Sequence, residues 1–291
     1  MNLDEAIEKT LKAGEILKKV IKEVEEKVVV GKKILDIAEF IENRITELGA
    51  KPAFPCNISI NSDAAHFTPR RGDERVFKMG DLVKIDAGAH IDGHIADMAI
   101  SIDLGENEKL IKACKDAVFN AIDSIKDGVN TAKISKIIEE TIKKYGFKPV
   151  VNLSGHGLMP YLAHAPPNIY NYATQRGVEL KEGMIIAIEP FATNGVGRVA
   201  ERGECEIYSL VNPKPVRLKA MREIISEISE KFRTLPFAKR WINKSELLIS
   251  KLVREGVFRE YPVLSEVSKG FVSQWEHTVI VEKDSARVVT F

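Results

Sequence analysis

Two aspartates in one short segment of the sequence could act together as metal ligands. Asp86 and Asp97 begin and end the segment DAGAHIDGHIAD. The Asp92-Gly93 dipeptide between them is a strong signal for a two-residue turn, so the segment predicts a β-hairpin. With the turn at this position, Gly88 faces Asp97, and Asp86 lies on the same face as Gly88. The two aspartates are then diagonal neighbours on one side of the hairpin, about 7–8 Å apart at their Cα atoms.

The face that carries these aspartates is predicted to have room for a ligand. It also carries the small residues Gly88, Ala99 and Ser101, whereas the opposite face is aliphatic and is expected to join the core. Two carboxylates this close repel each other, and the repulsion grows where water is excluded. The hairpin alone therefore fits two descriptions: solvated aspartates on an exposed sheet, or oxygen ligands for a divalent cation.

Three further residues could complete a metal site. His156 lies between two glycines in SGHGL, Glu189 ends the apolar strand IIAIE, and Glu276 lies in the largely apolar SQWEHTVIV. A carboxylate in an apolar strand is costly unless it has a partner. Taken singly, each residue is more typical of a structural role, such as a buried histidine bonded to the backbone or a carboxylate in an ion pair.

The order of these residues, with the text around them, resembles the methionine aminopeptidases of the pita-bread fold. The flanking segments are AFP, NSDAAHFTPRRGD, AIEPFATNG and VSQWEHTVIV, and the resemblance extends over residues 1–291. It implies an α+β protein with a helical insertion between Glu189 and Glu276, as in type II enzymes. Without the extra N-terminal region of eukaryotic members, the chain is similar to archaeal ones.

The resemblance also implies a role for each candidate metal ligand. Two divalent ions would be bridged by Asp97 and Glu276, with Asp86 on the second ion and His156 and Glu189 on the first. Four carboxylates and one imidazole suit Co, Mn, Fe or Zn, and the sequence does not choose among these metals.

Four residues are implied to act on the substrate. A hydroxide shared by the two ions would attack the first peptide bond, with Glu189 transferring the proton. His164, in LAHAP, would bond the scissile carbonyl, and His66, in DAAHFTP, would lie near the amide nitrogen. Phe54, in PAFP, would line the pocket for the methionine side chain. Without the resemblance, both histidines are interpreted as loop residues bonded to the backbone, and Phe54 as a core residue.

Helices and strands predicted from hydrophobic periodicity must position these residues. Amphipathic helices are expected over 3–28, 34–48, 106–125 and 131–145, and the hairpin is expected over 81–103. Long helices mixed with hairpins, without regular βαβ alternation, indicate an α+β fold. We expect a catalytic domain formed by residues 1–194 and 272–291, and a helical, winged-helix-like insertion over residues 195–271.

The insertion carries a net positive charge. Residues 214–255 contain eleven Lys and Arg against five Glu, which gives 11 − 5 = +6. Two predicted helices separated by LPFAKRW resemble a helix-turn-helix, so a nucleic-acid-binding module is one hypothesis. A simpler interpretation is a solvated basic wall beside the substrate cleft. A third hypothesis is that Lys239 and Arg240 contact ribosomal RNA near emerging nascent chains.

Two other functions remain open from the sequence. A proline-directed peptidase of the same fold is the nearest enzymatic rival, although such enzymes usually carry an additional N-terminal domain, for which the residues before Asp86 are too few. A non-catalytic relative that binds partners would be expected to lose ligands, whereas all five are present. The resemblance therefore favours a metalloenzyme that removes the initiator methionine from nascent polypeptides.

Composition limits the class of protein. The formal net charge is +1, so no global field selects nucleic acid or an acidic membrane. The sequence contains no run of about eighteen apolar residues and no signal-like N-terminus. Three scattered cysteines indicate reduced thiols rather than a disulfide framework. We expect a cytoplasmic monomer without membrane attachment.

Overall fold

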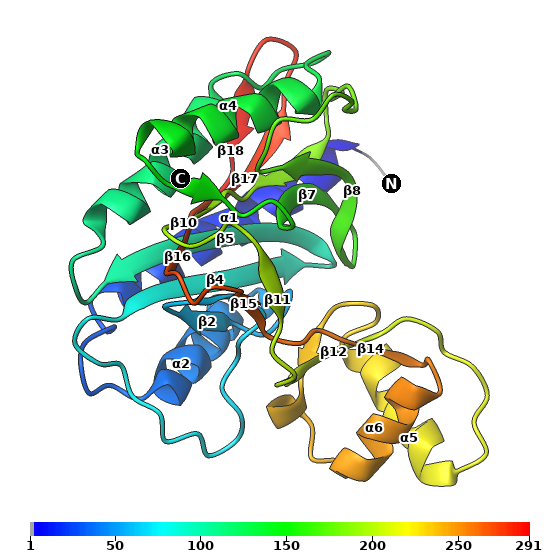
Figure 1. The fold of residues 1–291 in the computed structure, drawn as a ribbon. Helices are drawn as coiled ribbons and strands as arrows, with labels where there is room; N and C mark the ends of the chain where they lie inside the picture. Colours follow the sequence, from blue (N-terminus) through cyan, green and yellow to red (C-terminus); the bar gives the residue numbers. More distant parts are fainter. Residues whose placement is uncertain (1–2) are drawn as a thin grey trace.

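A nine-stranded sheet forms the centre of the computed structural model, which describes residues 3–291 (Figure 1). Its strands are β1 (Lys51–Pro52), β2 (Asn57–Ile60), β4 (Leu82–Ile91), β5 (His94–Asp103), β7 (Ser154–Met159), β8 (Leu162–Tyr170), β9 (Ile185–Ile188), β17 (Glu276–Val281) and β18 (Ala286–Val288). The main path runs β1-β4-β5-β17-β9-β7-β8, with β2 on β4 and β18 on β17. The C-terminal strand β17 thus lies between β5 and β9, which come from earlier parts of the chain.

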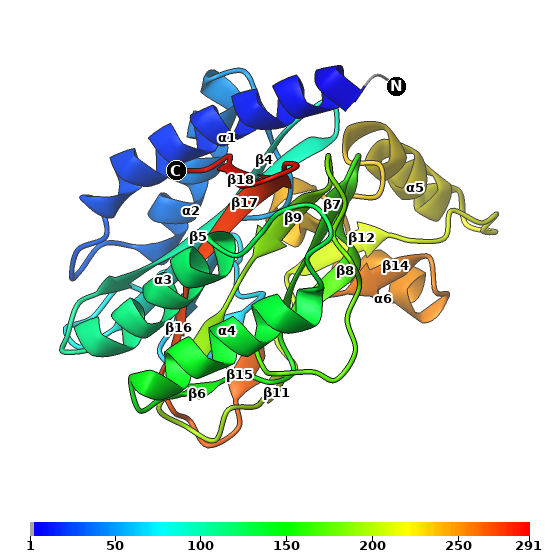
Figure 2. The same cartoon turned by 90° about the horizontal axis from the view of Figure 1, so that it is seen from above.

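Four helices pack on the sheet face that lies opposite the two aspartates (Figure 2). They are α1 (Leu3–Glu25), α2 (Ile34–Glu47), α3 (Glu108–Ile122) and α4 (Thr131–Lys144). The pair α1 and α2 forms one hydrophobic cluster with β4 and β5, and the pair α3 and α4 forms a second cluster with β9 and β17. All four predicted helices are present, with ends within three residues of the predicted ones. None of the helices described over residues 3–291 is long and apolar enough to cross a membrane.

The β4–β5 hairpin has the register that the sequence predicts. Gly88 pairs with Asp97, and Asp86 pairs with Ala99. Asp92 and Gly93 both have positive φ, at 50° and 89°, which is the conformation of the type I′ turn that an Asp-Gly pair favours. The opposite face, including Val83, Ile85 and Ile100, is buried against α1 and α2 as expected for a core face. The aspartates therefore face away from the helices.

The insertion has a hydrophobic cluster of its own, beside the sheet (Figure 1). It contains α5 (Lys219–Lys231), α6 (Glu246–Arg254), a 3-10 turn (Lys239–Trp241) and a sheet with the order β13-β12-β14. The strands of this sheet are β12 (Ile207–Leu210), β13 (Phe237–Ala238) and β14 (Phe258–Glu260). The two helices predicted on either side of LPFAKRW are present, and β13 and the 3-10 turn lie between them.

Two small sheets connect the insertion to the rest of the molecule. One contains β11 (Val199–Glu201), β15 (Leu264–Glu266) and β3 (Asp63–Ala65), and the other contains β16 (Val272–Gln274), β10 (Phe191–Thr193) and β6 (Lys148–Pro149). The carboxylate of Glu266 accepts hydrogen bonds from the backbone N–H groups of Val196, Gly197, Ser268 and Gly270. Glu266 thereby links the segment that enters the insertion to the segment that leaves it.

A buried ion pair holds the insertion against α2. Glu42 accepts hydrogen bonds from the Arg240 guanidinium, from Trp241 Nε1 at 2.8 Å and from the Cys56 N–H at 3.0 Å. The side chains of Arg240 and Glu42 are only 4% and 8% exposed. Arg240 also donates to Thr68 Oγ1 and the Pro69 carbonyl, at 2.7 and 3.0 Å.

Arg240 and Lys239 are therefore less available for RNA contact than the sequence alone suggests. Arg240 is buried, and Lys239 Nζ pairs with Glu206 at 2.8 Å and with Glu246 at 3.1 Å. Sequence counting could not reveal these partners, because Glu42 lies 198 residues away from Arg240 in the chain.

Replacing Glu42 by Ala is expected to lower the free energy of unfolding by about 3–5 kcal/mol, because Arg240 would remain charged and buried without its partner. Urea denaturation followed by tryptophan fluorescence measures this change, since Trp241 touches the same carboxylate. Glu223→Ala is the matched control, because it removes an exposed pair with Lys219 and should have no measurable effect. Equal destabilisation by the two substitutions would contradict a structural role for the buried pair.

Candidate metal centre

Three adjacent strands bring three carboxylates to one place on the sheet. Asp86 on β4 lies opposite Ala99 on β5, and Ala99 is also paired with Glu276 on β17. Asp97 lies two residues before Ala99 on the same face of β5. Because Gly88, Ala99 and Ser101 are small, no bulky side chain of this face separates the three carboxylates.

Strands β7 and β9 supply the other two candidate ligands. His156 on β7 pairs with Ala187 on β9, and Glu189 directly follows β9. A Cβ atom on either glycine beside His156 would lie 2.3 Å from a backbone oxygen, that of Ala187 for Gly155 and that of Pro166 for Gly157. The glycines are therefore required for the close approach of three strands that positions His156.

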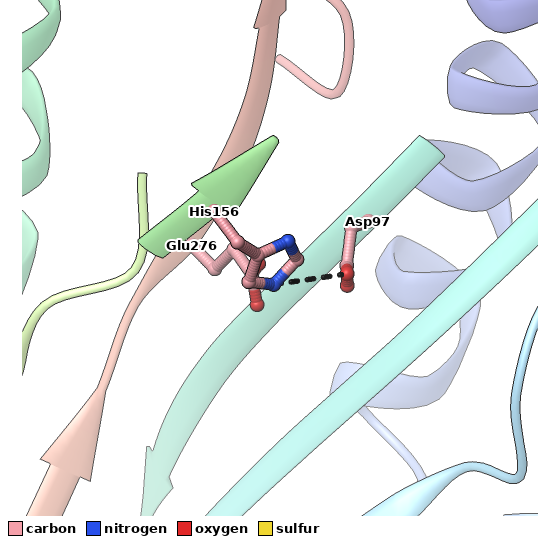
Figure 3. Close-up of side chains that lie close together, drawn as sticks. All are labelled: Asp97, His156 and Glu276. Carbon is pink, nitrogen blue, oxygen red and sulfur yellow. Dashed lines mark ion pairs between the residues drawn. The ribbon is translucent and has the colours of Figure 1, made fainter. Parts of the chain in front are cut away.

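The five residues form two overlapping groups of ligand atoms. Asp97, His156 and Glu276 offer atoms that all lie within 4.8 Å of one another, and so do Asp86, Glu189 and Glu276. Figure 3 shows the first group, in which His156 Nε2 lies 3.9 Å from Asp97 Oδ2. Glu276 belongs to both groups, as a bridging ligand would. Glu189 lies in the group of Asp86, whereas the resemblance assigns it to the ion of His156.

The electrostatics of the carboxylates fit a cation-binding site. Burial raises the pKa of Asp86 to about 6. The pKa values of Asp97, Glu189 and Glu276 are raised well above the usual range by burial first, and then by the negative charges of the neighbouring carboxylates. One oxygen each of Asp86, Asp97 and Glu276 is buried without a hydrogen-bond partner in the part of the chain that the structure describes. Divalent cations would satisfy these oxygens and remove the repulsion.

Neighbouring polar groups fix the orientation of the candidate ligands. Asn57 Nδ2 donates to Asp86 Oδ2 at 3.1 Å, and Gln274 Nε2 donates to Glu189 Oε1 at 2.8 Å. Thr278 Oγ1 accepts from the backbone N–H of Asp97 at 2.7 Å and donates to its carbonyl at 2.8 Å. Sequence reasoning missed all three of these residues. The only signal for them in the sequence was that Gln274 lies two positions before the candidate ligand Glu276 and Thr278 lies two positions after it.

A cavity of about 280 Å³ opens from this centre. All eight residues singled out in the sequence line it: Phe54, His66, Asp86, Asp97, His156, His164, Glu189 and Glu276. The insertion contributes Ile207, Pro236 and Tyr261 to the opposite wall, and none of these was predicted. The Phe54 ring lies against Gly88, where a Cβ atom would be only 2.4 Å from it. Phe54 therefore forms an aromatic wall directly beside the pair of aspartates.

Burial favours the neutral form of two of the cavity histidines, His66 and His164. Burial lowers the pKa of His66 to about 4, and its Nδ1 lies 3.2 Å from the carbonyl oxygen of Pro262. His164 is open to the cavity but surrounded by protein, and this environment lowers its pKa, with a further contribution from the charge of Arg259. The His164 and His156 ring centroids are 4.6 Å apart. A neutral imidazole can donate a hydrogen bond to a substrate atom without carrying a charge into the site.

His90 and His277, for which no chemical role was predicted, lie outside the cavity. His90 Nδ1 accepts from the Gly93 N–H at 3.0 Å, which stabilises the hairpin turn. His277 Nδ1 lies 3.0 Å from Thr290 Oγ1, on the helix-covered side of β17. These contacts agree with structural roles for both residues.

Known proteins with the same sequence features support an enzyme centre here. The chain matches the model of metallopeptidase family M24 over residues 8–283. It is 64% identical over 288 residues to a methionine aminopeptidase of Archaeoglobus fulgidus, covering 99% of each chain. It is 48% identical over 293 residues to a methionine aminopeptidase of Thermococcus onnurineus, covering 97% of this chain and 99% of that one. A methionine aminopeptidase structure from Thermotoga maritima superposes with a TM-score of 0.75 at 25% identity, covering 98% and 96% of the two chains.

The chain belongs to metallopeptidase family M24, among its archaeal methionine aminopeptidases. The predicted family, the pita-bread fold and the assignment as a metal-dependent aminopeptidase are thereby confirmed. The full-length match to methionine aminopeptidases also decides against the two rivals, a proline-directed peptidase and a non-catalytic binding protein.

Proposed function

We propose that this protein removes the N-terminal methionine from polypeptides through a pair of divalent metal ions. The observation that carries the proposal is the overlap of two largely buried ligand groups at Glu276, in the lining of the cavity. Asp86, Asp97, His156, Glu189 and Glu276 would hold the ions, which we take to be Co, Mn, Fe or Zn. When bound, such a pair supplies a water activated for attack at neutral pH.

The protein's own groups would then orient the substrate and move its protons. Glu189 would accept a proton from the attacking water and return it to the leaving amine, and Gln274 holds one of its oxygens. His164 would donate a hydrogen bond to the oxygen of the scissile carbonyl as negative charge develops there. His66 and Phe54 also line the cavity, where His66 would lie near the amide nitrogen and Phe54 would pack against the methionine side chain.

The shape of the site favours cleavage of the first peptide bond alone. We propose that the free α-amine of the substrate rests near Asp86, where an internal residue has no amine to offer. The insertion, over residues 195–271, acts as a subdomain that closes the cavity opposite the metal ligands through Ile207, Pro236 and Tyr261. All three cysteines are free, as is typical of a reducing compartment, and this supports a cytoplasmic enzyme.

Asp97→Ala is expected to abolish both metal binding and methionine release, because it removes a carboxylate from the centre of the site and leaves three acidic side chains to repel one another. Metal content, measured by mass spectrometry, and release of Met from a Met-Ala-Ser peptide should be measured on the same sample. Turnover by the metal-loaded variant at a rate near that of the wild type would contradict the assignment.

His164→Ala should instead retain the metals, because His164 is not among the grouped ligands. The loss of one donor to a developing oxyanion typically lowers kcat by about 10²–10³. Steady-state kinetics separate this effect from binding, since KM for the same peptide should change little. A loss of metal in this variant would show that His164 supports the ligands rather than the substrate.

A second proposal concerns the ribosome as a partner. Lys214, Arg217, Lys251 and Arg254 of the insertion are exposed, so they are better placed for RNA contact than Lys239 and Arg240. Reversal of all four charges is expected to weaken co-sedimentation with ribosomes at low salt, and binding by the wild type should fall steeply as salt rises. Binding that is insensitive to salt and to these substitutions would remove RNA contact through the insertion.

A further inference from the structure

The small sheet of the insertion has one face directed towards the active-site cavity. Tyr208, Leu210 and Phe258 belong to the insertion's own hydrophobic cluster, whereas Ile207 on β12 lines the cavity. Residues alternate between the two faces of a strand, so Ser209 shares the cavity side with Ile207. Ser209 is paired with Arg259 on β14, and this pairing places Arg259 on the same side.

Tyr261 marks the inner end of this face. Its ring centroid lies 5.6 Å from that of His66 and 6.4 Å from that of His164, and its hydroxyl lies 3.1 Å from Ser209 Oγ. Tyr261 lines the cavity and Arg259 does not, so the step from Tyr261 to Arg259 leads from the cavity towards solvent. Two residues of a strand span about 6.6–6.8 Å, which is also the length of about two residues of an extended peptide.

Arg259 carries a charge that is unpaired within the part of the chain that the structure describes. Its side chain is exposed and has no ion pair or hydrogen bond with any residue in the range 3–291. Three other basic residues of the insertion are paired: Lys239 with Glu206, Arg240 with Glu42, and Lys244 with Glu227 at 2.8 Å.

We propose that Arg259 is a specificity-determining residue that favours an acidic side chain at the third or fourth position of the substrate. This inference rests on the proposed function, which places the first two substrate residues between the metal ligands, Phe54 and the cavity histidines. The third and fourth residues of an extended chain leave the cavity beside Tyr261 and reach the guanidinium. A carboxylate there would gain a hydrogen-bonded partner, and an ammonium would meet a like charge.

The test compares kcat/KM for amidated peptides that differ in one side chain. Met-Ala-Asp-Ser and Met-Ala-Ser-Asp are paired with Met-Ala-Lys-Ser and Met-Ala-Ser-Lys, and Met-Ala-Ser-Ser is the uncharged reference. The wild-type enzyme is expected to prefer Asp over Lys at one of the two positions by about two- to fivefold, as for an exposed ion pair. The preference should shrink at about 1 M salt, where the Debye length is about 3 Å.

Two substitutions that change the net charge equally can distinguish a local contact made by Arg259 from a general electrostatic effect of the insertion. Arg259→Gln should abolish the preference and Arg259→Glu should invert it. Arg254→Glu changes the net charge of the insertion as much as Arg259→Glu, from the exposed end of α6, and should leave the preference as it is in the wild type.

Different results would contradict the role of Arg259 and the proposed aminopeptidase function. A wild-type enzyme that cleaves Asp and Lys peptides equally well, or an Arg254→Glu variant that inverts the preference, would overturn the role of Arg259 alone. Absence of methionine release from Met-Ala-Ser-Ser by the metal-loaded wild-type protein would overturn the proposed function together with this inference.

Discussion

The structure depends on the convergence of four carboxylates in a space from which most water is excluded. Each of Asp86, Asp97, Glu189 and Glu276 makes the ionised state of the others less favourable, and burial adds to this cost. Protons or divalent cations can remove the repulsion, and the unpartnered oxygens together with the neutral His156 favour cations. The surrounding residues serve this arrangement: small side chains leave room for it, and Asn57, Gln274 and Thr278 fix its geometry.

This constraint explains why the C-terminal strand lies in the middle of the sheet. The first half of the sheet carries Asp86 and Asp97 with α1 and α2 behind it, and the second carries His156 and Glu189 with α3 and α4 behind it. Strand β17 joins the two halves and brings Glu276, the residue shared by both ligand groups, to the line where they meet (Figure 2). Neither half could form both ligand groups alone, so assembly of the sheet and assembly of the site are the same event.

The parts of the site that depend on local chemistry could be predicted, and those that depend on strand order could not. The Asp92-Gly93 turn sets the hairpin register, so the relation between the two aspartates follows from a twelve-residue segment. The convergence of His156, Glu189 and Glu276 depends on the pairing of β7, β9 and β17, for which the only guide was resemblance. Tyr261 gave no signal at all, because its role arises from the position of the whole insertion. Counting charges also misled at Arg240, whose partner Glu42 lies in the second helix.

The insertion is better understood as a fixed wall than as an attached module. Arg240 and Trp241 hold it to α2 beneath the first half of the sheet, and Thr234 Oγ1 donates to the carbonyl of Tyr161 at the tip of the β7–β8 hairpin in the second half. The segment between these contacts contains Pro236, which lines the cavity. Because the wall is attached to both halves, the width of the cavity is set by the same sheet that sets the distances between the metal ligands. A shift of the insertion would therefore strain a buried ion pair at one end and the hairpin contact at the other. Substrate contacts on this wall are consequently placed in a constant relation to the ligands, although the two lie far apart in the sequence.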